Sequence, residues 1–240
     1  MPKPSRTPSR REDALSRDRI IDAAIHLLDA GGEHALTFRA LAQTLGTGAG
    51  AIYWHIADKS DLLTAACDAV VVRTLDECAR EASPQATIRA VALGLFDAMD
   101  AHAWVGSALM RAAGRLPTMR LVERIGQQVR ALGVADDAQW ATVSALLHYI
   151  VGVGGQNAAN ARHAQAHGLV RGDYLDSVAR AWEQLPAQEW PFVTSVASQF
   201  AAHDDRADFL AGIDLLLAGL ESGSRHTTST RRPKAARADA

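Results

Sequence analysis

The chain has 240 residues, of which 48% are hydrophobic and 22% are charged, and its formal net charge is −2. This composition is that of an ordinary protein with real hydrophobic cores, and no stretch reaches the roughly 20 apolar residues that a membrane helix needs. The N-terminal charges have no apolar segment behind them, which argues against a secretory signal and predicts a cytoplasmic protein without a membrane partner.

Charge is distributed unevenly along the chain. Residues 1–65 are balanced, residues 66–221 carry an excess of six acidic groups, and residues 222–240 carry an excess of four basic groups. The acidic body is the part least suited to contact phosphate. The two ends, residues 1–15 and 222–240, are basic and lack hydrophobic periodicity, so we expect disordered arms. Either these arms strengthen nucleic-acid binding or they are only solvated, and the residues leave both possibilities open.

Everything between the arms is predicted to be helical, because apolar residues recur with a helical period and strand-like alternation is missing. Ser16 suits the N-cap of the first helix, Gly31 or Gly32 can end that helix, and Gly46 ends the second. Pro84 marks a boundary, because proline is excluded from a helix interior. In chain order, the expected helices span residues 16–30, 37–45, 48–56, 59–82, 85–101, 104–113, 118–132, 136–167, 173–184, 192–202 and 205–220.

The stretch LGTGAGAIYWHIADK, residues 45–59, joins nearly bare backbone to three large rings. Two short helices joined by a turn at Gly46 form a helix-turn-helix unit, whose second helix must enter a major groove about 12 Å wide. Glycine and alanine leave a thin helix end that can approach bases and phosphates, and the rings can lie against the sugar-phosphate backbone. The alternative is that the glycines only form a loop and the rings fill a core. The candidate DNA contacts are Thr37, Arg39, Thr47, Gly48, Ala49, Gly50, Ala51, Tyr53, Trp54, His55 and Lys59.

The segment LTFRALAQTLGTGAGAIYWHIADKSDLLTA, residues 36–65, resembles the DNA-binding domain of the tetracycline-repressor (TetR) family. The shared features are a Thr-x-Arg helix start, Leu-Ala-x-x-Leu-Gly, a Tyr-x-His pair, and then Lys and Leu-Leu. The resemblance implies the roles of single residues. Phosphates would be bound by Thr37, Tyr53, His55 and Lys59, bases would be faced by Arg39, Ala49, Gly50 and Ala51, and Trp54 would lie between backbone and groove.

Two departures from the family pattern lie in the turn and the recognition helix. Thr47 and Gly48 stand where the family usually has Val-Ser or Val-Glu, so the usual cap is missing. The following positions, residues 49–51, carry no polar side chain that could read a base. We therefore expect sparse direct readout, resting on Arg39, on methyl contacts to thymine, and on DNA shape.

The resemblance also implies an N-terminal helix-turn-helix domain, residues 16–65, and a larger helical domain, residues 66–221. The latter would bind a small effector and dimerise through its last two long helices. The apolar stripe of residues 205–220 fits dimerisation, although burial within one subunit would explain it equally. The candidate effector contacts are Met99, His102, Trp104, Met110, His148, Gln156, Asn157 and Trp182.

A polar stripe on the longest predicted helix raises the question of a metal. Gln156, Asn160, His163 and His167 share one face, and the two histidines have the spacing of a metal pair. Cysteine and acidic residues that could complete a site are missing between them, so a solvated face is expected, without metal or cofactor.

The sequence thus predicts a dimeric, sequence-specific transcriptional regulator, a repressor released from a palindromic operator by a small molecule. The alternatives are an activator and an effector-independent DNA-binding protein. An enzyme is not expected, because the familiar nucleophile, phosphate-loop and zinc-protease motifs are missing.

Overall fold

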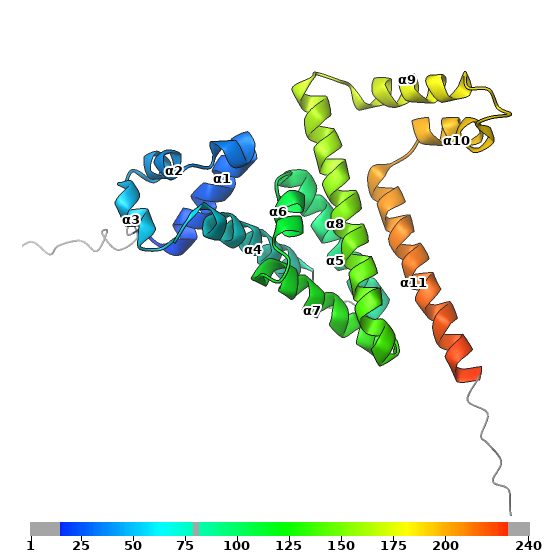
Figure 1. The fold of residues 1–240 in the computed structure, drawn as a ribbon, viewed down its shortest axis with the longest axis horizontal. Coiled ribbons are helices and arrows are strands. Elements are labelled where there is room, and N and C mark those ends of the chain that lie inside the picture. The colour runs from blue at the N-terminus through cyan, green and yellow to red at the C-terminus, as the bar shows by residue number, and fades with distance from the viewer. Residues whose placement is uncertain (1–14, 79–81, 230–240) are drawn as a thin grey trace, which may run out of the picture.

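The computed structural model describes residues 15–78 and 82–229, with side chains as far as residue 220, so residues 1–14 of the first predicted arm and 230–240 of the second lie outside the described residues. This part of the chain is all-α, as expected (Figure 1). None of its helices is long and apolar enough to span a membrane. The helices are α1 (Arg17–Ala35), α2 (Phe38–Leu45), α3 (Ala49–Tyr53), α4 (Lys59–Glu77), α5 (Pro84–Ala101), α6 (Val105–Arg111), α7 (Leu116–Ala131), α8 (Asp136–Ala166), α9 (Arg171–Glu183), α10 (Pro191–Ala201) and α11 (Asp205–Ser229).

The first three helices form a small unit at one end of the molecule (Figure 1). The Ser16 side chain caps α1 by accepting from the Arg19 N–H at 3.3 Å, as predicted. The helix kinks where the sequence predicted an end, at Gly31 and Gly32, and the latter has a φ of 65°. Ile20, Leu41 and Ile52, one from each helix, are fully buried and build the core of the unit.

Helix α4 connects this unit to the body and contacts α1, α5, α6 and α7. The helix ends at Glu77, with Cys78 as its cap, rather than at residue 82 as predicted. The next helix begins at Pro84, because Ser83 accepts the Ala86 N–H at 3.2 Å and proline suits a first turn. Sequence periodicity gives no reason for α4 to end early, since every residue up to 82 is compatible with a helix.

The body is built around the packing of α5 against α8, with α6 and α7 alongside. Two glycines allow α6 and α8 to approach closely, because a Cβ added to Gly106 would lie 2.9 Å from the Gly155 Cα. Met99 and Trp104 are buried in this interior. The interior between α5, α6 and α8 is therefore filled by the protein's own side chains.

The C-terminal part consists of an antiparallel pair, α9 and α10, and the last helix, α11, which packs against α5 and α8. The α9–α10 pair projects beyond the ends of α8 and α11 (Figure 1). The last helix continues to Ser229, past the predicted end at Leu220 and into the segment predicted as a tail. Extending an existing helix costs much less free energy than nucleating a new one. The last helix can therefore continue beyond its apolar residues.

Candidate functional site

The turn between α2 and α3 is closed by backbone hydrogen bonds around a single left-handed residue. Gly46 has a φ of 63°, which favours glycine. Its N–H donates to the Gln43 carbonyl at 3.3 Å, and the Thr47 N–H donates to the Ala42 carbonyl at 2.9 Å. At the other end of α2, the Thr37 Oγ1 accepts from the Ala40 N–H at 3.1 Å. Both ends of α2 are thus set by local chemistry, which aims α3 outward.

The start of α3 is bare, although the protein's own packing does not require it. Gly48 is the N-cap and makes no side-chain capping bond. A Cβ added at Gly48 or at Gly50 would meet no heavy atom within 4 Å. Neither glycine has a positive φ, unlike Gly46. Neither packing nor backbone geometry demands glycine at these two positions, so the bare surface is available to a partner.

The three rings that follow take up different positions. Tyr53 stacks on Phe38, with ring centroids 4.4 Å apart and planes 10° apart, yet it is 55% exposed. Trp54 is 88% exposed, and His55 is half-buried. The core position in this segment belongs to Ile52, which is fully buried. The alternative in which these rings fill a core therefore fails for Trp54 and holds only in part for Tyr53.

Cationic groups flank the same surface. Arg39 is exposed and makes no hydrogen bond or ion pair within the described part of the chain. The Lys59 Nζ donates to the Glu33 carbonyl at 2.5 Å, and the Arg17 Nη1 donates to the His55 carbonyl at 2.8 Å. An ammonium group has three donors, so Lys59 can hold the end of α1 and still offer N–H groups to a phosphate.

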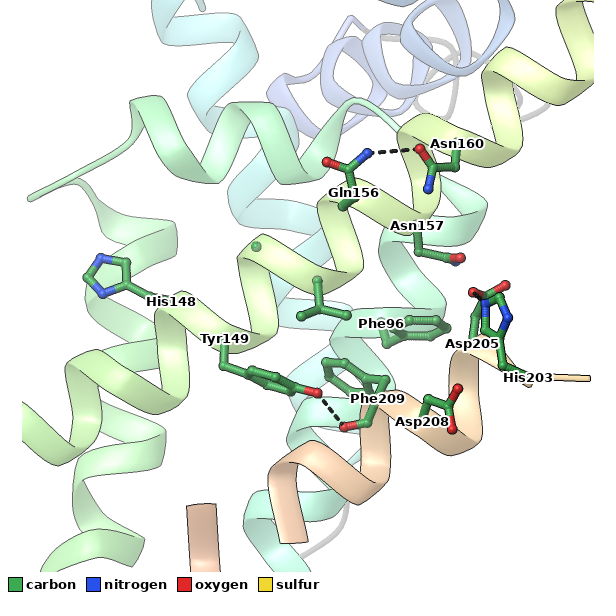
Figure 2. Close-up of a pocket in the computed structure, with 12 residues that line it drawn as sticks. Phe96, His148, Tyr149, Gln156, Asn157, Asn160, His203, Asp205, Asp208 and Phe209 are labelled. Atoms are coloured by element: carbon green, nitrogen blue, oxygen red, sulfur yellow. Dashed lines mark hydrogen bonds and ion pairs between the residues drawn. The ribbon is translucent and has the colours of Figure 1, made fainter. Parts of the chain in front are cut away.

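A cleft of about 400 Å³ lies in the body between α5, α8 and α11. The rings of Phe96, Tyr149 and Phe209 form one side, whereas Asn157 and Asp205 lie toward the other end (Figure 2). The cleft therefore combines apolar walls with polar groups, which is the usual make-up of a small-molecule site.

Two family models match the chain in succession. The model of bacterial regulatory proteins of the tetR family covers residues 20–66, and that of the tetracyclin repressor-like C-terminal domain covers residues 80–223. The chain belongs to the TetR family.

Known members of the family resemble this TetR-family chain to different extents in its two parts. The solved structure of the transcriptional regulator SCO7222, a TetR from Streptomyces coelicolor, is 48% identical, covers 87% of this chain and 99% of its own, and has a TM-score of 0.80. The transcriptional repressor DrrR1 of Streptomyces coeruleorubidus is 25% identical over 91% of this chain and 81% of its own. The class D tetracycline repressor of Escherichia coli is 42% identical, but over only 26% of this chain and 28% of its own.

The TetR-family body brings three of the eight predicted effector residues to the cleft, namely His148, Gln156 and Asn157. Met110 is 65% exposed on α6, and the Trp182 ring contacts the Phe200 ring within the α9–α10 pair, with the two planes tilted by 37°. The remaining three, Met99, His102 and Trp104, serve packing or interdomain contacts instead.

The sequence prediction did not include most of the cleft. The residues it missed are Phe96, Tyr149, Gly152, Val153, Asn160, His203, Asp205, Asp208 and Phe209. A prediction from the sequence could have found the aromatic pair on α5 and α11 only by assuming that these helices pack side by side. The predicted polar stripe is exposed, and the rings of His163 and His167 lie 4.2 Å apart. No group of metal ligands was found within the described residues.

The connection between the two domains is a cluster of polar contacts on the end of α1. One oxygen of Asp29 accepts from the His102 Nδ1 at 2.8 Å and from the Trp104 Nε1 at 2.7 Å. Glu33 pairs with Arg111 on α6. Both carboxylates belong to α1, whereas their partners belong to the body, so a shift of the α5–α6 connection would act directly on the DNA-binding unit.

Proposed function

We propose that this TetR-family regulator is a dimeric repressor that binds a palindromic operator and leaves it when a small molecule binds the body. The observation that carries the proposal is the open surface at Gly48 and Gly50, beside the exposed Trp54. Packing within the chain does not explain this surface, and a DNA groove does. The named relatives DrrR1 and the class D tetracycline repressor, both called repressors, favour repression over activation.

On this proposal, the residues of the helix-turn-helix unit divide into two groups. Arg39 and the helix start at residues 49–51 face the bases. Thr47 lies in the turn, and Trp54 between backbone and groove. Phosphates are contacted by Thr37, Tyr53, His55 and Lys59. Because only Arg39 offers a polar side chain to the bases, most of the specificity would come from thymine methyl contacts and DNA shape.

Dimerisation is supported by the outer faces of α8 and α11. Leu215 is 76% exposed on α11, next to the exposed small residue Ala211. Ala145 and Gly152 are exposed on α8. Small residues beside a large exposed leucine let helices approach and bury the leucine against a second copy. The other side of α11 carries Phe209, which is already buried within the chain, so the same helix supplies both a core and an interface.

Release would proceed through α1 and α4. Body side chains hold α4 at several points, including Arg115, which donates to the Thr64 Oγ1 at 2.9 Å, and Arg120, which donates to Asp68 at 2.7 Å. A ligand that shifts the body would tilt α4 and pull α1 through Asp29. In a dimer this changes the separation of the two recognition helices, which must match one turn of DNA, about 34 Å.

Selection of bound sequences from a random duplex pool tests the proposal. The purified protein is incubated with the pool at physiological salt, and the retained DNA is sequenced. We expect a palindrome with half-sites about one helical turn apart. Retention of unrelated sequences, with binding that disappears as salt rises, would mean that the protein reads no bases and would overturn the proposal.

A further inference from the structure

The outward face of α7 carries four residues on one side of the helix. Met119, Glu123, Gly126 and Arg130 follow one another at spacings of three or four positions, so they fall within about 60° around the helix axis. The opposite side of α7 holds its buried residues and packs on α4, α5 and α8. Met119 is 49% exposed, and both charged residues are exposed as well. This side of α7 is therefore directed away from the core.

A hollow of about 330 Å³ lies beside these residues, between α7 and the first turns of α8. Its apolar lining comes from Val122, Gly126, Trp140 and Val143. The Trp140 ring is 69% exposed at the edge of the hollow. Exposed tryptophan is uncommon on a solvated surface and is enriched where proteins bind one another. We call the four α7 residues together with Trp140 the α7 surface.

The glycine in the middle of the α7 surface has no explanation within the chain. Glycine destabilises a helix interior relative to alanine. Gly126 does not have a positive φ, and a Cβ added there would meet only the Val143 Cγ2, at 3.8 Å, which is an ordinary contact. Neither backbone geometry nor packing among the described residues thus requires glycine. The close approach of a second helix would require it, because the side chains at a helix crossing set the distance between the two axes.

The two charges of the α7 surface are complementary to each other across a two-fold axis. Arg130 makes no side-chain hydrogen bond or ion pair with the residues that the structure describes, and Glu123 only accepts from the Gln127 amide at 2.7 Å. Glu123 and Arg130 lie about 10.5 Å apart along the helix, on either side of Gly126. In an antiparallel pair of α7 helices that cross at Gly126, each Glu123 faces the Arg130 of the second copy. A symmetric dimer contact needs a surface that is complementary to itself in this way.

We propose that the α7 surface binds a second copy of this chain, with the two α7 helices antiparallel and crossing at Gly126. This contact is separate from the proposed dimer interface. Helices α7 and α11 pack against α8 from opposite sides (Figure 1). Trp140 and the exposed Ala145 differ by five positions, which places them about 140° apart around α8. If the dimer forms through α8 and α11, the α7 surface joins two dimers, and this inference goes beyond the proposed function without depending on it.

Sedimentation velocity of the full-length protein tests the contact. The range runs from about 1 to about 200 µM, because a contact of one helix per copy is small and weak. We expect the mass to double over this range. Glu123→Arg makes arginines face each other, and Arg130→Glu makes carboxylates face each other, so each should raise the Kd for doubling at least about tenfold. Arg180→Glu, at an exposed arginine on α9, is the matched control and should leave the Kd unchanged.

Mixing the two charge-reversed variants separates the contact from damage to the fold. In an equimolar mixture of Glu123→Arg and Arg130→Glu, the variant with two arginines meets the variant with two glutamates, so attraction returns and the mass should double again. Misfolded protein would not be restored by mixing. Gly126→Leu tests the close approach. It should also weaken doubling at least about tenfold, with no loss of thermal stability, because a Cβ fits at this position and leucine favours a helix.

Three results would overturn the inference. They are a parent protein whose mass does not double, a doubling that neither charge reversal weakens, and a mixture that associates no better than its two components. In the first case the α7 surface would serve a partner other than a second copy. Operator binding, measured at low protein concentration on the same preparations, should be equal for the parent and the α7 variants. Parent protein that doubles in mass but selects no DNA sequence would reject the proposed function and retain the α7 contact.

Discussion

On the proposed function, the start of α3 and the body cleft solve opposite problems in binding. The start of α3 carries two glycines, and a Cβ at Gly48 or Gly50 would point into open space. In the cleft, three rings and several charged groups are crowded together from α5, α8 and α11. A DNA groove is itself bulky and charged, so the protein needs only a thin surface that fits into it. A small ligand has little surface of its own, so the protein must surround it with side chains.

The similarity to known proteins divides at the same place. The class D tetracycline repressor resembles this chain at 42% identity over 62 residues only, whereas DrrR1 aligns along 91% of the chain at 25%. A helix that must fit a constant DNA groove has few solutions. The body can change its side chains as long as α5, α8 and α11 still pack, and the resemblance to tetracycline repressors therefore carries no information about the ligand.

The largest expected effect comes from breaking the proposed dimer. Leu215→Asp places a charge at the centre of the proposed interface, twice in a symmetric dimer, and should weaken dimerisation by about 4 kcal/mol, roughly a thousandfold. Sedimentation velocity at micromolar concentration measures the dimer fraction. Asp214→Asn, next to it on α11 and paired with Arg89, should leave the dimer intact. A dimeric Leu215→Asp protein would place the interface elsewhere.

The second largest effect should come from adding a side chain to the bare start of α3. Gly50→Leu should weaken operator binding about a hundredfold, near 3 kcal/mol, because the new side chain blocks approach to the groove. The free protein should be no less stable, since the position is open and leucine favours a helix. Gly172→Leu, at an equally open glycine on α9, serves as the control for both operator titration and thermal unfolding. An unaffected operator affinity would exclude α3 from the groove.

Substitutions of Arg39 and Lys59 distinguish a base contact from a phosphate contact in the proposed DNA-binding surface. Arg39→Ala should cost about 1 to 3 kcal/mol on the operator and relax its specificity, because Arg39 is assigned to a base. Lys59→Ala should weaken operator and random DNA by similar factors and flatten the salt dependence, as a phosphate contact does. Titrations on both DNAs over a range of salt separate the two. Parallel losses on both DNAs for both variants would contradict the assignment.

The smallest effect concerns the link between the two regions. Asp29→Asn removes the charge from the oxygen that accepts from His102 and Trp104, and should cost about 1 kcal/mol of unfolding free energy. Asp22→Asn, on the same helix as Asp29, breaks an exposed pair with Arg73 of α4 and should cost less than about 0.5 kcal/mol. Denaturant unfolding measures both. Equal costs would mean that Asp29 contributes no more than a surface charge.

The sequence predicted best where structure depends on neighbours in the chain. The cap of α1 at Ser16, the break at Gly46, and the start of α2 after Thr37 each follow from one residue type and its own backbone. At Gly31 and Gly32 the sequence predicted an end, whereas α1 only kinks there and continues to Ala35. The candidate DNA-binding stretch, residues 45–59, is continuous in the sequence, so its composition could be recognised directly. The early end of α4 could not be predicted in this way. Whether α4 continues or α5 begins after its N-cap Ser83 depends on how both helices pack in the body.

The sequence by itself determined the all-α class, the helix-turn-helix unit and the bare start of α3, since each rests on interactions within a few residues. Only the tertiary structure decided which side chains meet in the body. Phe96 and Phe209 stand far apart in the chain, yet their rings lie 4.7 Å apart. Periodicity shows that a helix has an apolar face but not which helix covers it. The cleft and the hydrogen bonds from His102 and Trp104 to Asp29 therefore depend on tertiary packing.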